Sequence, residues 1–128
     1  MKTDDLINFP GQFQKFLRVF SKVTCLSVLF LIFVGGMVTS TGSGLAVPDW
    51  PLSYGMLLPP MVGGVFYEHG HRMAAATVGF LMLVLAAALS RFEKRKWVKN
   101  LGWLTLGTVV LQGILGGMTV LFFLPLGV

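Results

Sequence analysis

Apolar and polar residues occupy separate long blocks of this chain instead of alternating along it. With their flanking residues, three apolar runs cover about residues 21–40, 70–90 and 101–124. Each run is close to the roughly 20 residues that an α-helix needs to cross the hydrocarbon core of a bilayer. The pattern predicts an all-α integral membrane protein with three transmembrane helices. A cleaved signal peptide is the alternative for the first run, but the polar region before it is long and no clear small-residue cleavage site follows it.

The composition supports the membrane class. Of the 128 residues, 55% are hydrophobic and only 12% are charged, and the mean hydropathy is +0.79. A soluble domain of this length needs more polar surface. The net charge of +5 does not indicate nucleic-acid binding, because the basic residues stand in short blocks beside the apolar runs, as topology signals do. The single cysteine, Cys25, excludes an intrachain disulfide.

The basic blocks predict the orientation of the chain in the cell (inner) membrane. The loop between the first two spans, residues 41–69, contains no Lys or Arg, and Arg72 follows its end. Loops that are rich in Lys and Arg stay on the cytoplasmic side. We therefore expect the N-terminus and the 91–100 connection to be cytoplasmic and residues 41–70 to lie outside. The basic residues concerned are Lys2, Lys15, Arg18, Lys22, Arg91, Lys94, Arg95, Lys96 and Lys99.

The first 20 residues form a separate segment in this prediction. Between residues 9 and 20, aromatic and aliphatic side chains recur at helical spacing, and Pro10 and Gly11 mark the start. This pattern is typical of an amphipathic helix that lies in the membrane interface. Segment 1–20 is therefore expected to lead into a helical bundle formed by residues 21–128.

The outer loop 41–69 is rich in Gly and Pro, which exclude a long helix, yet it is too apolar for a disordered tether. Asp49 is its only charge before Glu68, and Trp50 and Tyr54 have the amphipathic character favoured at a membrane surface. Two interpretations stay open. The loop either anchors the protein at the membrane surface or forms a lid over a site at the outer face.

Two similar glycine pairs stand at the outer ends of spans one and three. Gly35–Gly36 and Gly116–Gly117 are each followed by Met and, within a few residues, by Thr. Glycine pairs allow a close approach of the backbone, either between helices or to a flat ligand. By itself the pattern favours ordinary helix packing.

Both histidines of the chain stand in the short polar sequence YEHGHR, residues 67–72, at the start of the second apolar run. A helix turns by about 100° per residue, so Glu68 and His71 share a face. His69 points elsewhere, and its direction predicts hydrogen bonds at the outer surface. The two histidines are therefore not expected to bind one metal together.

Beneath His71, the same helix face continues as a stripe of mostly small residues: Ala75, Val78, Gly79 and Met82. A large flat ligand fits such a stripe. A single histidine suits haem, whose second axial ligand can come from another helix. Zinc is disfavoured, because the chain has too few ligands for a closed tetrahedral set. At this point a purely structural polar cap, with Arg72 reaching to the interface, stays open as the alternative.

Three ordered blocks resemble the N-terminal half of the haem A synthase family (CtaA type), which acts in cytochrome c oxidase assembly. They are residues 35–55, 68–72 and 112–125, and the resemblance covers nearly all of the chain after residue 20. It implies a four-helix haem-binding bundle of which these three helices are a part. It also implies an oxidoreductase that converts haem O to haem A by oxidising a ring methyl to a formyl, with haem B in a C-terminal half.

Carried over by position, the resemblance implies roles for single residues. His71 matches the axial ligand of the haem iron, Glu68 matches an acidic residue needed for catalysis, and Arg72 is expected to pair with a haem propionate. The other residues expected at the haem are Gly35, Gly36, Gly116, Gly117 and, in the loop as a lid, Asp49 and Trp50. Expected partners are haem O, membrane lipid, haem O synthase, cytochrome oxidase assembly factors and, in a homo-oligomer, other copies of the chain.

The chain departs from the family pattern in two places. Many relatives carry a cysteine pair in the outer loop, near the positions of Val47 and Ser53, so the corresponding disulfide is excluded here. The sequence ends at Val128, before the family's fourth helix with its opposing histidine, and we therefore expect a truncated bundle. Two alternatives to an enzyme follow. One is a non-catalytic haem-binding subunit that needs a partner chain for the second axial ligand, and the other is a small transport or packing subunit without a cofactor.

Overall fold

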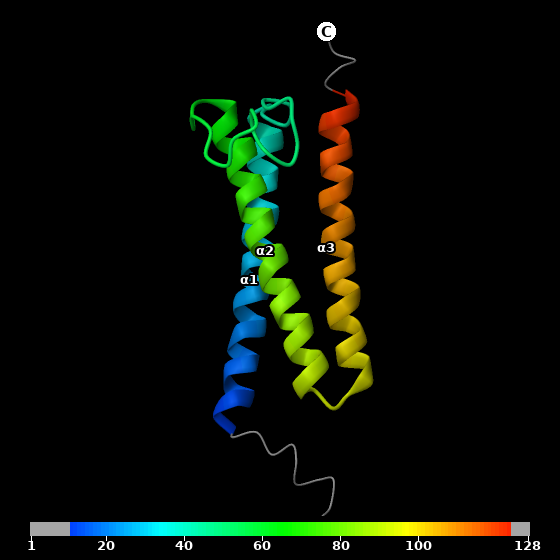
Figure 1. Ribbon diagram of the computed structural model, residues 1–128. Helices are drawn as coiled ribbons and strands as arrows, with labels where there is room; N and C mark the ends of the chain where they lie inside the picture. The colour runs from blue at the N-terminus through cyan, green and yellow to red at the C-terminus, as the bar shows by residue number, and fades with distance from the viewer. Residues whose placement is uncertain (1–10, 124–128) are drawn as a thin grey trace, which may run out of the picture.

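The computed structural model of the protein describes residues 11–123, and within this range it contains three α-helices and no β-strand (Figure 1). Helix α1 spans Gly11–Ser40, α2 spans Gly64–Phe92 and α3 spans Lys96–Phe123. All three are long and apolar enough to cross a membrane. The prediction of an all-α membrane protein with three transmembrane helices is confirmed.

The helices begin earlier than the apolar runs. No Gly or Pro interrupts residues 12–34, so residues 11–20 and the first span form one continuous helix rather than two segments. Residues 9 and 10 of the expected interfacial helix lie outside the described residues. Helix α2 begins at Gly64, and the loop before it is therefore residues 41–63. Helix α3 begins at Lys96, so its first turn includes basic residues of the expected connection.

Helix α2 is the centre of the bundle. It packs against both α1 and α3, whereas α1 and α3 make little contact with each other. Helices α2 and α3 approach each other closely at Gly102, where an added Cβ would lie 3.1 Å from Leu89 Cδ1 and 3.5 Å from Ala86 Cα. The Trp103 indole N–H donates to Ser90 Oγ at 2.5 Å beside this contact. A glycine therefore sets the distance between these two helices.

Most of the helical surface is apolar and exposed. Phe33, Phe80 and Leu104, one from each helix, are 64%, 65% and 66% exposed. In a bilayer such side chains meet lipid, which removes the cost of exposing them to water. The hydroxyl groups of α1 need no lipid partner either: Thr24 Oγ1, for example, donates to the Phe20 carbonyl at 2.9 Å within the helix.

The two ends of the bundle differ in charge. Figure 1 shows loop 41–63 at one end and the turn between α2 and α3, together with the start of α1, at the other. Within the described range, all Lys and Arg residues except Arg72 belong to the second end: Lys15, Arg18, Lys22, Arg91, Lys94, Arg95, Lys96 and Lys99. This segregation agrees with the expected orientation, which stays a prediction.

Candidate functional site

The centre of loop 41–63 is built around the Asp49 carboxylate. Its two oxygens accept hydrogen bonds from the backbone N–H groups of Tyr54, at 2.7 Å, and Gly55, at 2.8 Å. The hydrogen bond from Gly55 is the main reason that the pKa of Asp49 lies below its usual value. Tyr54 and Gly55 both have positive φ, and the Trp50–Pro51 peptide is cis. Asp49, expected at the haem, therefore has a structural role inside the loop.

Glu68 joins the loop to α2. It is buried, with 5% of its surface exposed, and both carboxylate oxygens have a partner. Oε2 accepts from the backbone N–H of Val47 at 2.8 Å, and Oε1 accepts from Arg72 Nη2 at 2.6 Å. No hydrogen bond connects Glu68 to His71 in the described part of the chain, although the two residues are three positions apart on α2.

Arg72 is engaged by the same loop. Besides its ion pair with Glu68, Nη1 donates to the backbone carbonyls of Asp49, at 2.6 Å, and Leu52, at 2.8 Å. A longer contact of 3.4 Å leads to Ser53 Oγ. The guanidinium thus holds the centre of the loop against α2, and a haem propionate would have to share it with these acceptors.

His69 makes hydrogen bonds with the outer loop, as expected, but its predicted position at the surface is wrong. The residue is buried, with 3% of its surface exposed, because the loop folds over it. Its Nε2 lies 2.9 Å from the Leu57 carbonyl and its Nδ1 lies 2.7 Å from Ser53 Oγ. A carbonyl only accepts, so Nε2 donates to Leu57, and in the neutral ring Nδ1 accepts from the Ser53 hydroxyl. Both nitrogens are therefore occupied and unavailable to a metal.

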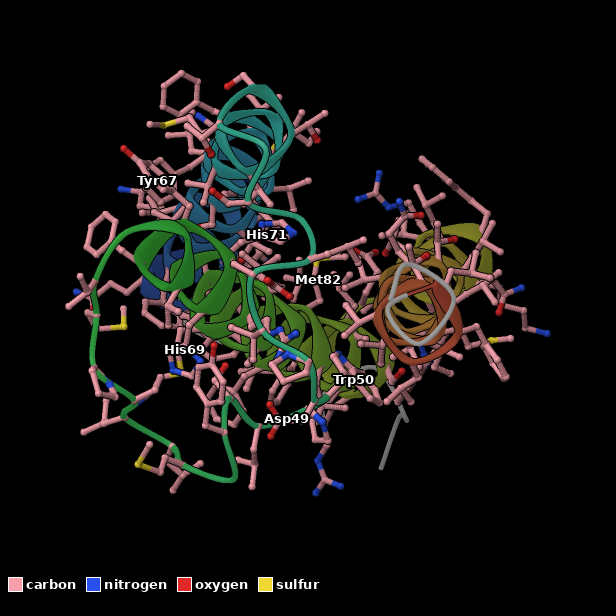
Figure 2. The ribbon with its side chains drawn as sticks, turned by 90° about the horizontal axis from the view of Figure 1, so that it is seen from above. Asp49, Trp50, Tyr67, His69, His71 and Met82 are labelled. Atoms are coloured by element: carbon pink, nitrogen blue, oxygen red, sulfur yellow. The ribbon has the colours of Figure 1, made fainter. Side chains whose placement is uncertain are left out.

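His71 differs from His69 in having no such partner. It is half-buried on α2, its Nδ1 is fully covered, and no hydrogen bond reaches the ring from the described residues. The ring lies against α1 at Gly35, where an added Cβ would be 3.2 Å from His71 Cε1. Figure 2 shows the ring between α1 and α2 on the side toward α3. His71 is therefore the one histidine whose imidazole is free to bind a ligand.

Only one residue of each expected glycine pair is used for a close approach. Gly35 lies against His71, and Gly117 lies against the Trp50 indole, where an added Cβ would come within 2.5 Å of the ring. Gly36 and Gly116 have no atom near their Cβ positions in the described chain. Gly36 and Gly116 were also expected to allow a close approach, but they face a different direction from Gly35 and Gly117, because successive helix positions point about 100° apart. Trp50 also connects the loop to α3.

The stripe beneath His71 is partly covered by helix packing. Val78 and Met82 are buried, with 3% and 8% of their surfaces exposed. Figure 2 shows Met82 directed toward α3. A flat ligand at His71 therefore cannot lie on the stripe as deep as Met82.

An apolar groove lies between α1 and α2, with a volume of about 270 Å³. Its lining includes Phe30, Val34, Tyr67 and Ala74. In Figure 2, Tyr67 and His71 lie on opposite sides of the contact between α1 and α2. The groove is therefore separate from the imidazole of His71.

The donor set fits haem better than a metal ion held by the chain alone. No group of three or more His, Cys, Asp or Glu residues in the described range is able to hold a metal ion. Haem iron, in contrast, needs only one imidazole from this chain. His71 provides an unpaired, half-buried imidazole beside a glycine. The residues of this site therefore fit a haem.

Comparison with known proteins agrees with this chemistry. The family model described as "Cytochrome oxidase assembly protein" (COX15-CtaA) matches residues 18–63. A protein named haem A synthase from Alkalihalophilus pseudofirmus is 31% identical over 112 residues, covering 84% of this chain and 37% of that protein. By sequence, the chain is similar to part of this protein. The corresponding protein of Bacillus licheniformis is 33% identical over 112 residues, or 84% of this chain and 36% of that protein.

The match to the haem A synthases is partial in length. The chain spans little more than a third of the length of the relatives that it matches. No solved structure matches the chain. The comparisons therefore establish the family resemblance, and the arrangement of the site comes from the structure of this chain.

The sequence did not predict that two residues of the outer loop bind α2. Val47 and Ser53 are fully buried, and they bind Glu68 and His69 across 21 and 16 positions of the chain. The sequence offered two signals for them: their place in an unusually apolar loop and the cysteine pair that the family resemblance puts near these positions. Which helix residue each one meets depends on how the loop folds back, and no local pattern specifies that.

Proposed function

We propose that this chain contributes the haem O binding part of a haem A synthase, an oxidoreductase that converts a ring methyl of haem O to a formyl. The observation that carries the proposal is the unpaired His71 imidazole against Gly35, in a chain similar to proteins named haem A synthase. When bound, haem O supplies the iron for axial ligation and the methyl group that is oxidised. The chain supplies the ligand, the pocket wall and the loop above it.

The roles of the individual residues follow from their contacts. His71 would ligate the iron, and Gly35 leaves room for its ring. Glu68 stands one helical turn before His71, where a carboxylate would be able to relay protons, orient the haem or stabilise positive charge that develops on the methyl. Its contacts with Arg72 and Val47 hold this carboxylate in position.

The proposal includes a place in the cell. The chain would lie in the inner membrane with its N-terminus and the 93–95 turn in the cytoplasm and loop 41–63 outside, because the basic residues gather at the opposite end from the loop. Haem O synthase and cytochrome oxidase assembly factors are the expected partners, since one class makes the substrate and the other uses the product. Homo-oligomer formation belongs to the same proposal.

The activity is tested by extracting haems from membranes that contain the full gene product together with a haem O synthase, in cells without another haem A synthase. We expect haem A, identified by mass and by its formyl-shifted spectrum, with the parent protein and none with His71→Ala. Gly36→Ala is the matched control, since its Cβ meets nothing. Membranes with folded parent protein that contain haem O but no haem A would contradict the proposed activity.

A non-catalytic haem-binding subunit is the second candidate. It is favoured by the fact that only one imidazole of the chain is free, because His69 is bound to the loop through both nitrogens. In that case a partner chain must provide the second axial ligand. Co-purification of a second membrane chain with haem, without haem A formation, would support this candidate over the enzyme.

A further inference from the structure

We propose that His69 is a positioning residue, which fixes the outer loop over the end of the bundle where His71 lies. His69 takes no part in the proposed chemistry, yet it is buried and paired at both ring nitrogens. Both partners, Ser53 and Leu57, belong to the second half of loop 41–63. A histidine with only a packing role would not need two loop partners.

The two halves of the loop are held by different residues of α2. Glu68 binds the first half at Val47, and Arg72 binds the centre from Asp49 to Ser53. After Ser53, in the part of the chain that the structure describes, the hydrogen bond from His69 to the Leu57 carbonyl is the only one between residues 54–62 and α2. Losing His69 would therefore release the second half of the loop first.

The Ser53 hydroxyl connects these contacts. It accepts the long contact from Arg72 Nη1 and donates its own hydrogen to His69 Nδ1. Because a hydroxyl has one hydrogen, this arrangement requires His69 Nδ1 to be unprotonated. The donors and acceptors of Arg72, Ser53, His69 and Leu57 are thus consistent, and removing the imidazole leaves the buried Ser53 hydroxyl without its acceptor and the Leu57 carbonyl without its donor.

The consequence reaches α3 through Trp50. This residue stands between the segments held by Glu68 and by His69, and its indole covers Gly117. A loop fixed at Val47, Ser53 and Leu57 keeps Trp50 there. That the loop covers a haem at His71 rests on the proposed function. That His69 holds the loop in place does not depend on it.

The test is the rate at which chymotrypsin cuts the loop of the full chain in detergent, after Tyr54 or Leu57, which are exposed. His69→Leu should speed this cleavage at least about tenfold, because both hydrogen bonds from the ring to the loop are lost, and one of them is buried. His69→Gln keeps a donor and an acceptor and should return the rate most of the way to that of the parent. Trypsin cleavage in the 93–95 turn at the other end is the control and should not change.

Ser53→Ala keeps α2 intact and serves if His69→Leu does not fold. It should also speed loop cleavage, by less than His69→Leu. Unchanged loop cleavage in the folded His69 or Ser53 variants would overturn the proposal. An equal rise at the trypsin site would overturn it too, because His69 would then stabilise the whole bundle.

A haem titration separates this inference from the proposed function. His69→Leu should weaken haem binding about tenfold, as loop opening does, while the Soret band keeps the position of the parent because His71 still ligates the iron. A shifted band in His69→Leu would overturn the positioning role. If the parent chain binds no haem at all, the proposed function fails, and the cleavage rates still decide the role of His69.

Discussion

Two Glu–Arg pairs of this chain have similar chemistry and different surroundings. Glu68 and Arg72 are 2.6 Å apart with side chains 6% and 11% exposed. Glu93 and Arg95 are 3.0 Å apart, and the Arg95 side chain is 61% exposed. A buried pair has lost its hydration, so each charge depends on the other, whereas water and salt screen an exposed pair. The same substitution should therefore have unequal effects at the two positions.

We expect Glu68→Gln to lower the free energy of unfolding by about 3 kcal/mol, because the buried charge of Arg72 then has no negative charge beside it. Glu93→Gln is the matched control and should change it very little. Unfolding of the helical circular dichroism signal in detergent measures both. Equal losses at the two positions would show that burial of the Glu68–Arg72 pair has no energetic weight.

The Glu93 pair also predicts a pH dependence. Mainly through the side-chain hydrogen bond from Arg95, the pKa of Glu93 falls from 4.5 to about 2. Because the pKa of the folded state is the lower one, the carboxylate stabilises the fold above about pH 4.5. This contribution is lost as the pH falls from there toward 2. The difference in unfolding midpoint between parent and Glu93→Gln should be small near neutral pH and vanish at about pH 2.

The contact of Gly35 with His71 gives a further prediction at this scale. Gly35→Ala places a methyl group 3.2 Å from His71 Cε1, so the ring must move. We expect haem affinity to fall about tenfold, because a displaced imidazole ligates iron less well. Gly36→Ala should bind haem as the parent does, and a Soret titration compares the two. Equal affinity in both variants would mean that Gly35 does not set the ring position.

At the scale of helices, the contact between α2 and α3 depends on one glycine. Gly102 is buried against Leu89 and Ala86, while Gly107, one and a half turns later on α3, has no atom near its Cβ position. Both positions are in the same helix and both are glycines. They differ in whether α2 lies beside them.

Gly102→Leu should destabilise the bundle by about 1–3 kcal/mol, because the new side chain has to push α3 away from α2. Gly107→Leu should have no such cost and should slightly favour the helix, since leucine is the better helix former. Unfolding in mixed detergent measures both variants. A Gly102→Leu protein as stable as Gly107→Leu would contradict the close approach at this position.

The elements were predictable and their connections were not. Apolar run length specified three spanning helices, and the basic residues marked one end of the bundle. The helices extend beyond the apolar runs because polar residues such as Lys96 and Arg18 are also good helix formers. The spacing of His69 and His71 showed that they point apart, but not that a loop 16 positions away would bury His69. Such long-range contacts depend on the fold of the loop.

At the scale of the whole molecule, the segregation of charge predicts the orientation in the membrane. Leu58 in the loop is 80% exposed, and Lys94 in the turn at the opposite end is exposed as well. In a Cys25→Ser background, Leu58→Cys in intact cells should react with a membrane-impermeant maleimide. Lys94→Cys should react only after the membrane is opened. The reverse pattern would contradict the orientation.

The central claim is that His71 is the residue of this chain that holds haem, and a haem titration of the purified chain tests it most directly. The parent should give a Soret band of a histidine-ligated haem, with the Gly36→Ala control unchanged. His71→Ala should lose this band or bind at least about tenfold more weakly, because no other free imidazole is present. A His71→Ala protein with the band and affinity of the parent would contradict the account.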